Sequence, residues 1–320
     1  MPAITSGKVL VSGANGYIAP NARPAFWVVR ALLEEGFSVR GAFELAVVPD
    51  IMQDGALDEA VKGVDAIEHT ASPCHFHADD PAELLEPAIR GTVGILESAR
   101  KYGTAVKRVV VTSSCAAVMT VSDQPQFLSE VSWNDQSPRE VEEKGRAASA
   151  EAKYNTSKIL AERAAWDFVA KHGAEIGWDL VVLNPPLVLG PMIHAVASVD
   201  TLNHSAHMMY NALTTPGAAG GGGRWTDVRD LALAHVRALQ REPAGGERII
   251  VAAGAFTWQD WLDAAPPASR YQKGTPGAGK DHVHLLRYDN GKSVRVLGME
   301  YHSMADTAEA VVADYEARGW

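Results

Sequence analysis

The stretch Val9-Leu-Val-Ser-Gly-Ala-Asn-Gly-Tyr-Ile-Ala19 decides the fold of this 320-residue chain. Its short apolar run ends at Gly13, which is typical of a buried parallel strand. The G-x-x-G-x-x-A pattern that follows allows a tight turn, and the small residue at its end lets a helix pack closely on the sheet. Free N–H groups at that helix N-terminus attract phosphate. We therefore expect a dinucleotide-binding turn, the alternative being an ordinary glycine turn.

Strands and helices alternate along the next 170 or so residues. Buried strands are expected at 37–43, 64–70, 106–112 and 179–183, and helices at 26–35, 82–101 and 146–171. This alternation predicts an α/β fold, a Rossmann-type doubly wound parallel sheet.

The pattern loosens after residue 190. The segment 214–224 reads as a glycine-rich loop, and the later elements are helices at 227–240, 257–264 and 303–318 and a strand at 247–252. We expect residues 1–190 to form the dinucleotide-binding domain, with returns near 225–253. Residues 191–320 are expected to form mainly a small C-terminal substrate-binding lobe.

Composition excludes several classes of protein. Lys and Arg number 29 against 39 Asp and Glu, a formal net charge of −10, which argues against broad binding to nucleic acid or anionic membranes. Two cysteines, Cys74 and Cys115, exclude a disulfide scaffold. No run of about 18 apolar residues is present, and because the first residues do not combine a basic region with an apolar one we expect no signal peptide. We expect a cytoplasmic protein, monomeric or homodimeric.

Tyr154 and Lys158 stand four residues apart in a helical stretch. Positions i and i+4 share one helix face. A lysine ammonium near a phenol favours the phenolate and lowers the pKa of the tyrosine, which makes Tyr154 a usable proton donor at neutral pH. The same spacing in isolation also fits a solvated helix face.

Thr112-Ser-Ser114 ends the strand at 106–112. Carboxyl ends of parallel strands face the ligand crevice, so a hydroxyl here can hold a carbonyl oxygen beside Tyr154. The alternative is a serine that caps the next turn.

Together these motifs resemble the extended short-chain dehydrogenase/reductase family. Within it, the chain is most similar to the dihydroflavonol-reductase-like branch with its fungal aldehyde, ketone and methylglyoxal reductases. Further matching stretches keep the family order over nearly the whole chain: His69-Thr-Ala-Ser-Pro73, Arg108-Val-Val-Val-Thr-Ser-Ser-Cys-Ala-Ala-Val118, Asn184-Pro-Pro-Leu-Val-Leu-Gly-Pro191, Asp227-Val-Arg-Asp-Leu-Ala232, Phe256-Thr-Trp-Gln-Asp260 and Lys292-Ser-Val-Arg-Val-Leu-Gly298.

The resemblance implies an oxidoreductase that reduces a small-molecule aldehyde or ketone to the alcohol, with NADP as cofactor and NAD possible. Tyr154 would protonate the carbonyl oxygen and Lys158 would hold the nicotinamide ribose. Ser114 would bind the substrate oxygen, with Ser113 as the alternative. No metal is implied. The other implied cofactor-binding residues are Gly13, Asn15, Gly16, Tyr17, Ile18, Ala19, Arg40, Asp50, Ile51, Thr70, Ala71, Ser72, Pro185, Leu187 and Val188.

The chain departs from the family pattern in two segments. Residues 20–26 look like an insertion, in which Pro24 fits the first turn of the next helix. Residues 40–50 are too short for the usual crossover between parallel strands, so that either one strand is lost or the segment runs on as one long strand. We expect Glu44 to begin a third strand at 45–48, although it could instead bind a ribose hydroxyl and favour NAD. The NADP-selecting arginine is missing, and Arg40 is a weak substitute.

Two single positions also depart from expectation. Glu68 falls in a strand predicted to be buried, where a lone charge is costly. Gly94 stands in a helix where many extended members carry an asparagine linked to a proton relay.

Two alternatives to a carbonyl reductase stay open from the sequence. The irregular segments could have removed dinucleotide binding and left a non-catalytic scaffold or partner-binding protein. A sugar-nucleotide epimerase or dehydratase of the wider family is the other alternative.

Overall fold

The computed structural model of the protein describes residues 4–13, 23–40, 47–73, 76–218 and 220–320. Its centre is a six-stranded sheet in the order β2-β1-β3-β4-β6-β9, and every pairing in it is parallel. The strands are β1 (Lys8–Ser12), β2 (Ser38–Arg40), β3 (Ala66–His69), β4 (Arg108–Thr112), β6 (Asp179–Asn184) and β9 (Arg248–Ile250).

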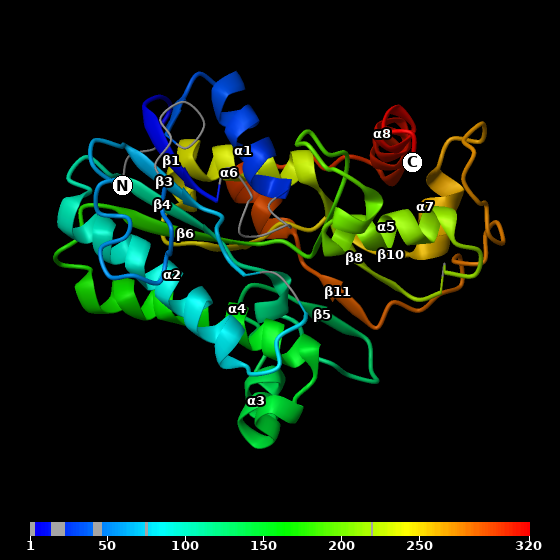
Figure 1. The fold of residues 1–320 in the computed structure, drawn as a ribbon, viewed down its shortest axis with the longest axis horizontal. Helices are drawn as coiled ribbons and strands as arrows, with labels where there is room; N and C mark the ends of the chain where they lie inside the picture. The colour runs from blue at the N-terminus through cyan, green and yellow to red at the C-terminus, as the bar shows by residue number, and fades with distance from the viewer. Residues whose placement is uncertain (1–3, 14–22, 41–46, 74–75, 219) are drawn as a thin grey trace.

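The two faces of this sheet are covered by different pairs of helices (Figure 1). Strand alternation directs Val9 and Val11 to one face and Leu10 to the other, and all three are buried. A sheet covered on both faces accounts for the continuous apolar runs of its strands. The pairs are α1 (Arg23–Glu34) with α6 (Val228–Gln240), and α2 (Ala82–Tyr102) with α4 (Ala150–His172).

A second group of elements lies beside the sheet, on the right in Figure 1. Its core contains the aromatic side chains of Trp225, Phe256 and Trp261, whose rings meet edge to face. It consists of the three-stranded sheet β10-β8-β7 and three helices: β7 (Leu187–Leu189), β8 (Gly222–Asp227), β10 (Gly254–Thr257), α5 (His204–Thr214), α7 (Trp258–Ala264) and α8 (Met304–Ala317).

The remaining described elements connect these two groups. A short parallel pair joins β5 (Gln126–Leu128) to β11 (Leu286–Tyr288), and α3 (Gln136–Lys144) packs on α4. Single turns of 3-10 helix lie at η1 (Cys115–Ala117), η2 (Gly145–Ala147), η3 (Val199–Thr201) and η4 (Glu242–Ala244), and the π-helical η5 spans Ser293–Leu297.

The predicted doubly wound parallel sheet is confirmed. Helix α1 begins at Arg23, so Pro24 does lie in its first turn, where the missing N–H is harmless. The proposed division at residue 190 stays a prediction. No helix of the described part of the chain is both long and apolar enough to cross a bilayer.

The third strand predicted at 45–48 is wrong in its described part. Residues 47 and 48 are not in a strand, and β3 pairs directly with β1, with β2 on the other side. The apolar side chain of Val48 instead packs on the core between the sheet and α2 and α4. For the short segment 40–50, the alternatives were a lost strand and one long strand. The lost strand fits the described residues 47 and 48. Glu44 lies outside the described residues.

Two other predicted boundaries are wrong. The helix predicted from residue 146 begins at Ala150, because the Ser149 hydroxyl accepts the N–H of Ala152 and caps it. The loop predicted through residue 224 contains the first half of β8. Glycine is suited to this strand because a Cβ on Gly222 would come 2.1 Å from the carbonyl oxygen of Phe256 on β10.

Candidate active site

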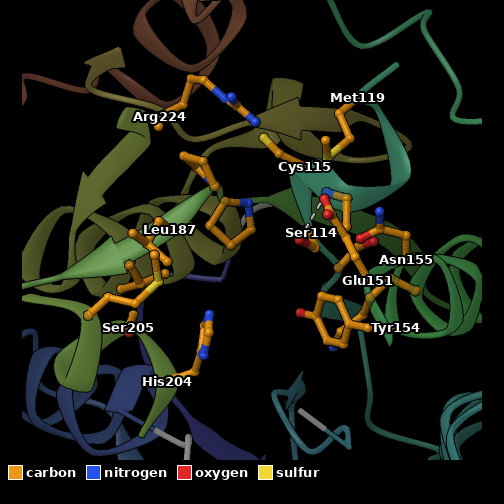
Figure 2. Close-up of a pocket in the computed structure, with 18 of the residues that line it drawn as sticks. Ser114, Cys115, Met119, Glu151, Tyr154, Asn155, Leu187, His204, Ser205 and Arg224 are labelled. Carbon is orange, nitrogen blue, oxygen red and sulfur yellow. Dashed lines mark hydrogen bonds between the residues drawn. The ribbon is translucent and has the colours of Figure 1, made fainter. Parts of the chain in front are cut away.

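A cavity of about 820 Å³ opens where the carboxyl ends of β4 and β6 meet the second group of elements. Ser114, which the sequence placed at the end of a strand, and Tyr154 and Lys158, which it placed on one helix, all line it. Figure 2 shows Ser114 and Tyr154 on the same side of this cavity, with Leu187 and His204 across from them.

Ser114 is placed by the turn that follows β4. It is the cap of η1, and its hydroxyl oxygen accepts the N–H of Ala116 at 3.0 Å. An oxygen that accepts this bond keeps its own hydrogen available to donate. The capping role and the predicted substrate-binding role therefore coexist in one side chain.

Ser113 has a different environment, although it also lines the cavity. Its hydroxyl donates to the buried carboxylate of Glu162 at 2.5 Å. The same carboxylate accepts from the amide of Asn184 at 2.8 Å and from Arg248 at 2.5 Å. Ser113 thus belongs to a buried polar network, which leaves Ser114 as the better candidate to contact substrate.

Helix α4 carries Tyr154 and Lys158 on one face. The ammonium of Lys158 lies 5.9 Å from the centroid of the Tyr154 ring. Lys158 is 7% exposed, which does not fit a solvated helix face. The Phe76 ring contacts the rings of Tyr154 and His204, with centroid distances of 5.0 and 4.7 Å, and adds an apolar surface to the cavity next to the phenol.

The ends of β1 and β3 are joined beside the cavity through Ser12. Its carbonyl accepts the hydroxyl of Thr70 at 2.6 Å, and its hydroxyl lies 2.9 Å from Nδ1 of His69. The next residue, Gly13, has a φ of 75°, and a Cβ there would come 3.2 Å from the Cα of Ala71. The backbone of Ala71 therefore passes close to this turn, and only glycine fits without strain.

Burial, together with the smaller effect of the Lys158 charge, lowers the pKa of His69 to about 4. Between pH 6.5 and about 4 the unfolded chain then binds one proton more than the folded protein, so stability falls as the pH is lowered through this range. We expect His69→Gln to reduce the dependence of the free energy of unfolding on pH by up to about 1.4 kcal/mol per pH unit in this window. Urea titrations from pH 7 to 4 measure this, with His207→Gln, exposed on α5, as control. Equal slopes for wild type and His69→Gln would contradict the prediction.

The predicted cofactor-binding residues fall into three groups. Thr70, Ser72, Pro185, Leu187 and Val188 line the cavity, and Gly13 and Ala71 lie next to one another beside it. Asn15, Gly16, Tyr17, Ile18 and Ala19 lie outside the described residues.

The third group, Arg40, Asp50 and Ile51, is not among the residues that line the cavity. Nη1 of Arg40 donates to the carbonyls of Ala60 at 2.9 Å and Lys62 at 2.5 Å. The Asp50 carboxylate accepts the N–H of Met52 at 2.8 Å, and Ile51 packs against α2. Their predicted contacts with the adenosine half of a cofactor stay predictions.

The expectation of a lone charge at Glu68 is wrong, because α6 supplies a partner. A carboxylate oxygen of Glu68 lies 2.6 Å from Nδ1 of His235 on α6. Nε2 of the same histidine lies 3.1 Å from the Thr112 hydroxyl. Burial raises the pKa of Glu68, and His235 partly offsets this. Gly94 faces the carbonyl oxygen of Ile51, to which a Cβ would come within 3.8 Å.

Sequence reasoning missed several residues that line the cavity. Phe76 carries no local signal, because it follows a segment with no periodicity. Arg224 had one: it is a single cation at the end of a glycine run, just before an apolar strand segment. The other missed lining residues include Met119, Glu151, Phe256, Trp258 and Tyr288.

Comparison with known proteins gives one family and several relatives. The model of the NAD dependent epimerase/dehydratase family matches residues 9–254. The chain is 34% identical to ketoreductase azaE of Aspergillus niger over 93% of its length and 94% of that protein. It is 33% identical to the NADPH-dependent methylglyoxal reductase GRE2 of Saccharomyces cerevisiae, over 94% of this chain and 96% of that one.

Solved structures agree with these matches. The crystal structure of yeast methylglyoxal/isovaleraldehyde reductase Gre2 complexed with NADPH superposes with a TM-score of 0.83 at 31% identity, over 98% of this chain and 99% of that chain. The Candida albicans Gre2 complex with NADPH has a TM-score of 0.83 at 28% identity, over 97% of this chain and 98% of that one.

Proposed function

Because this chain belongs to the NAD dependent epimerase/dehydratase family, we propose that it is an NADPH-dependent reductase that converts an aldehyde or ketone to the alcohol, with Tyr154 as proton donor. The observation that carries the proposal is the convergence of Ser114, Tyr154 and Lys158 on one cavity. The similarity to reductases over nearly the full chain, among them one crystallised with NADPH, supports this choice of reaction and cofactor.

The residues present fit the nicotinamide end of such a cofactor. Pro185, Leu187 and Val188 offer an apolar strip on which a flat ring can lie, and Thr70 and Lys158 add polar groups for its amide and ribose. When bound, NADPH supplies the hydride that reduces the carbonyl carbon.

The side chains of the cavity would act on the carbonyl oxygen. The Ser114 hydroxyl donates a hydrogen bond to this oxygen and orients it. Tyr154 transfers its phenolic proton to the oxygen, which becomes the alcohol hydroxyl, and the phenolate left behind is stabilised by the Lys158 ammonium. Phe76 limits access of water to the phenol on one side. Solvent returns the proton to Tyr154 before the next turnover.

A cofactor and substrate assay tests this function. NADPH and NADH binding is measured by fluorescence, and oxidation of each is followed with a panel of aldehydes and ketones. We expect NADPH to bind more tightly and to be oxidised with at least one carbonyl compound. Absence of binding by both dinucleotides would favour the scaffold alternative. Binding without carbonyl reduction, together with conversion of a sugar nucleotide, would favour an epimerase.

The two serines after β4 should respond differently to substitution. Ser114→Ala removes a donor to the carbonyl oxygen and is expected to lower kcat about 10²-fold with little loss of stability. Ser113→Ala removes a partner of buried Glu162 and is expected to cost about 1–3 kcal/mol of stability, with the smaller effect on kcat. Steady-state kinetics and urea unfolding of both variants give the comparison. A larger loss of kcat in Ser113→Ala would assign the substrate contact to that serine.

A further inference from the structure

The cavity contains a cation with no carboxylate partner among the described residues. Arg224 lies on β8, where strand alternation sends Trp225 into the aromatic core and Arg224 to the opposite side. Figure 2 shows the Arg224 side chain reaching toward Cys115 across the top of the pocket. Its Nε is buried and has no hydrogen-bond partner in the part of the chain that the structure describes.

Two buried arginines of this protein, Arg108 and Arg248, each have a carboxylate partner, whereas Arg224 is half-buried and has none among the described residues. Arg108 forms a two-pronged ion pair with Asp179, at 2.6 and 2.8 Å, and Arg248 pairs with Glu162. A buried guanidinium N–H without a partner costs free energy, so an unmatched one in a cavity needs a reason. A ligand that carries the missing anion supplies one.

The surroundings of Arg224 place this charge close to the expected reaction centre. Its guanidinium carbon lies 5.8 Å from the ring centroid of Tyr288, whose hydroxyl donates to the Cys115 carbonyl at 3.4 Å. Cys115 directly follows Ser114 in the chain. Glu151 also lines the cavity, but it is exposed on the first turn of α4, where water screens its charge.

We propose that Arg224 binds a carboxylate of the substrate, so that the enzyme favours oxo acids over neutral carbonyl compounds. The inference rests on the proposed reductase function and names its substrate class. The substrate carbonyl lies at Ser114 and Tyr154, and its carboxylate, a few bonds away, meets the planar guanidinium, which matches the two carboxylate oxygens. A neutral ester of the same skeleton brings no anion to the guanidinium, and this is the basis of discrimination.

The test compares each acid with its own ester. Values of kcat/KM are measured for 2-oxo, 3-oxo and 4-oxo acids and for their methyl esters. This series varies the number of bonds between the carbonyl group and the carboxylate. We expect wild type to favour the acid by at least about tenfold at one chain length, and Arg224→Gln to remove this preference. The esters should lose less activity than the acids in this variant, since they make no charged contact with Arg224.

Two control variants distinguish a direct contact between Arg224 and the substrate carboxylate from a long-range effect of positive charge. Arg287→Gln removes the same charge from the exposed face of β11 and should keep the wild-type ratio of acid to ester. Arg224→Lys keeps the charge without the planar fork and should retain part of the preference. If Arg287→Gln lowers the ratio as much as Arg224→Gln does, the preference comes from long-range electrostatics and the proposal is overturned.

Failure of this inference and failure of the reductase function give different results. Ester reduction by wild type, with a ratio that Arg224→Gln leaves unchanged, overturns the carboxylate site and keeps the reductase. If no carbonyl compound is reduced, calorimetric binding of the corresponding hydroxy acids decides instead. Binding at least about tenfold weaker in Arg224→Gln supports the site, while equal or absent binding in the two proteins overturns it.

Discussion

Tyr154→Phe is expected to lower kcat for carbonyl reduction by about 10³–10⁴-fold and to leave the fold and NADPH binding intact. The variant loses only the phenolic oxygen. The ring keeps its contact with Phe76, and the Ser114 hydroxyl still orients the carbonyl. Without the proton, the developing alkoxide must be neutralised by water, which is a poorer acid at this position.

The measurement is a single-turnover rate under saturating NADPH, with a fluorescence titration for cofactor affinity and circular dichroism for the fold. Tyr210→Phe on α5 controls for the loss of a tyrosine hydroxyl, because Tyr210 packs in the core of the second group of elements. Turnover close to the wild-type rate in Tyr154→Phe would refute the assignment of the proton donor.

Arg248→Met is expected to cost about 3–5 kcal/mol of stability, because it leaves the Glu162 carboxylate buried without its cation. Arg248 also donates to the carbonyls of Glu130 and Ser132, at 2.7 and 2.6 Å, and its guanidinium lies 3.9 Å from the centroid of the Trp133 ring. One side chain therefore ties β9 to the segment before α3 and to α4.

Arg163→Met is the matched control. Arg163 stacks on the same ring of Trp133, at 4.9 Å, but its side chain is 39% exposed and pairs with exposed Asp135. Its loss is expected to cost no more than about 1 kcal/mol. Unfolding of both variants in guanidinium chloride measures the difference in their stability. Similar costs would mean that the contact with Trp133, and not the buried ion pair, carries the stabilisation.

The parts of the fold that the sequence predicted are those with strong local patterns. The strand before Gly13, the apolar run at 106–112 and the helix at 227–240 were recognised because burial on one or both faces fixes their periodicity. The strand expected at 45–48 is wrong at the described residues 47 and 48 for the same reason: an apolar run shows that residues are buried, not that they pair with a neighbour.

The site was predictable where it depends on short spacings along the chain. Tyr154 and Lys158 are one helical turn apart, and Ser114 ends a strand, so their positions follow from local geometry. Phe76, Arg224 and Tyr288 reach the cavity only because distant segments pack together. The β8 strand begins with two glycines, which have no strand preference of their own, and their pairing with β10 determines this part of the strand. No local pattern reveals such a contact.

The residues that line the cavity are spread along the chain from Thr70 to Tyr288. When the ribosome has synthesised every strand of the parallel sheet except β9, the chain contains Ser114, Tyr154 and Lys158. It does not yet contain Arg224, Phe256 or Tyr288. During synthesis the groups proposed for catalysis are present long before the residues proposed to select a substrate. The wall of the cavity is complete only when β11, the last described strand, has brought Tyr288 to it by pairing with β5.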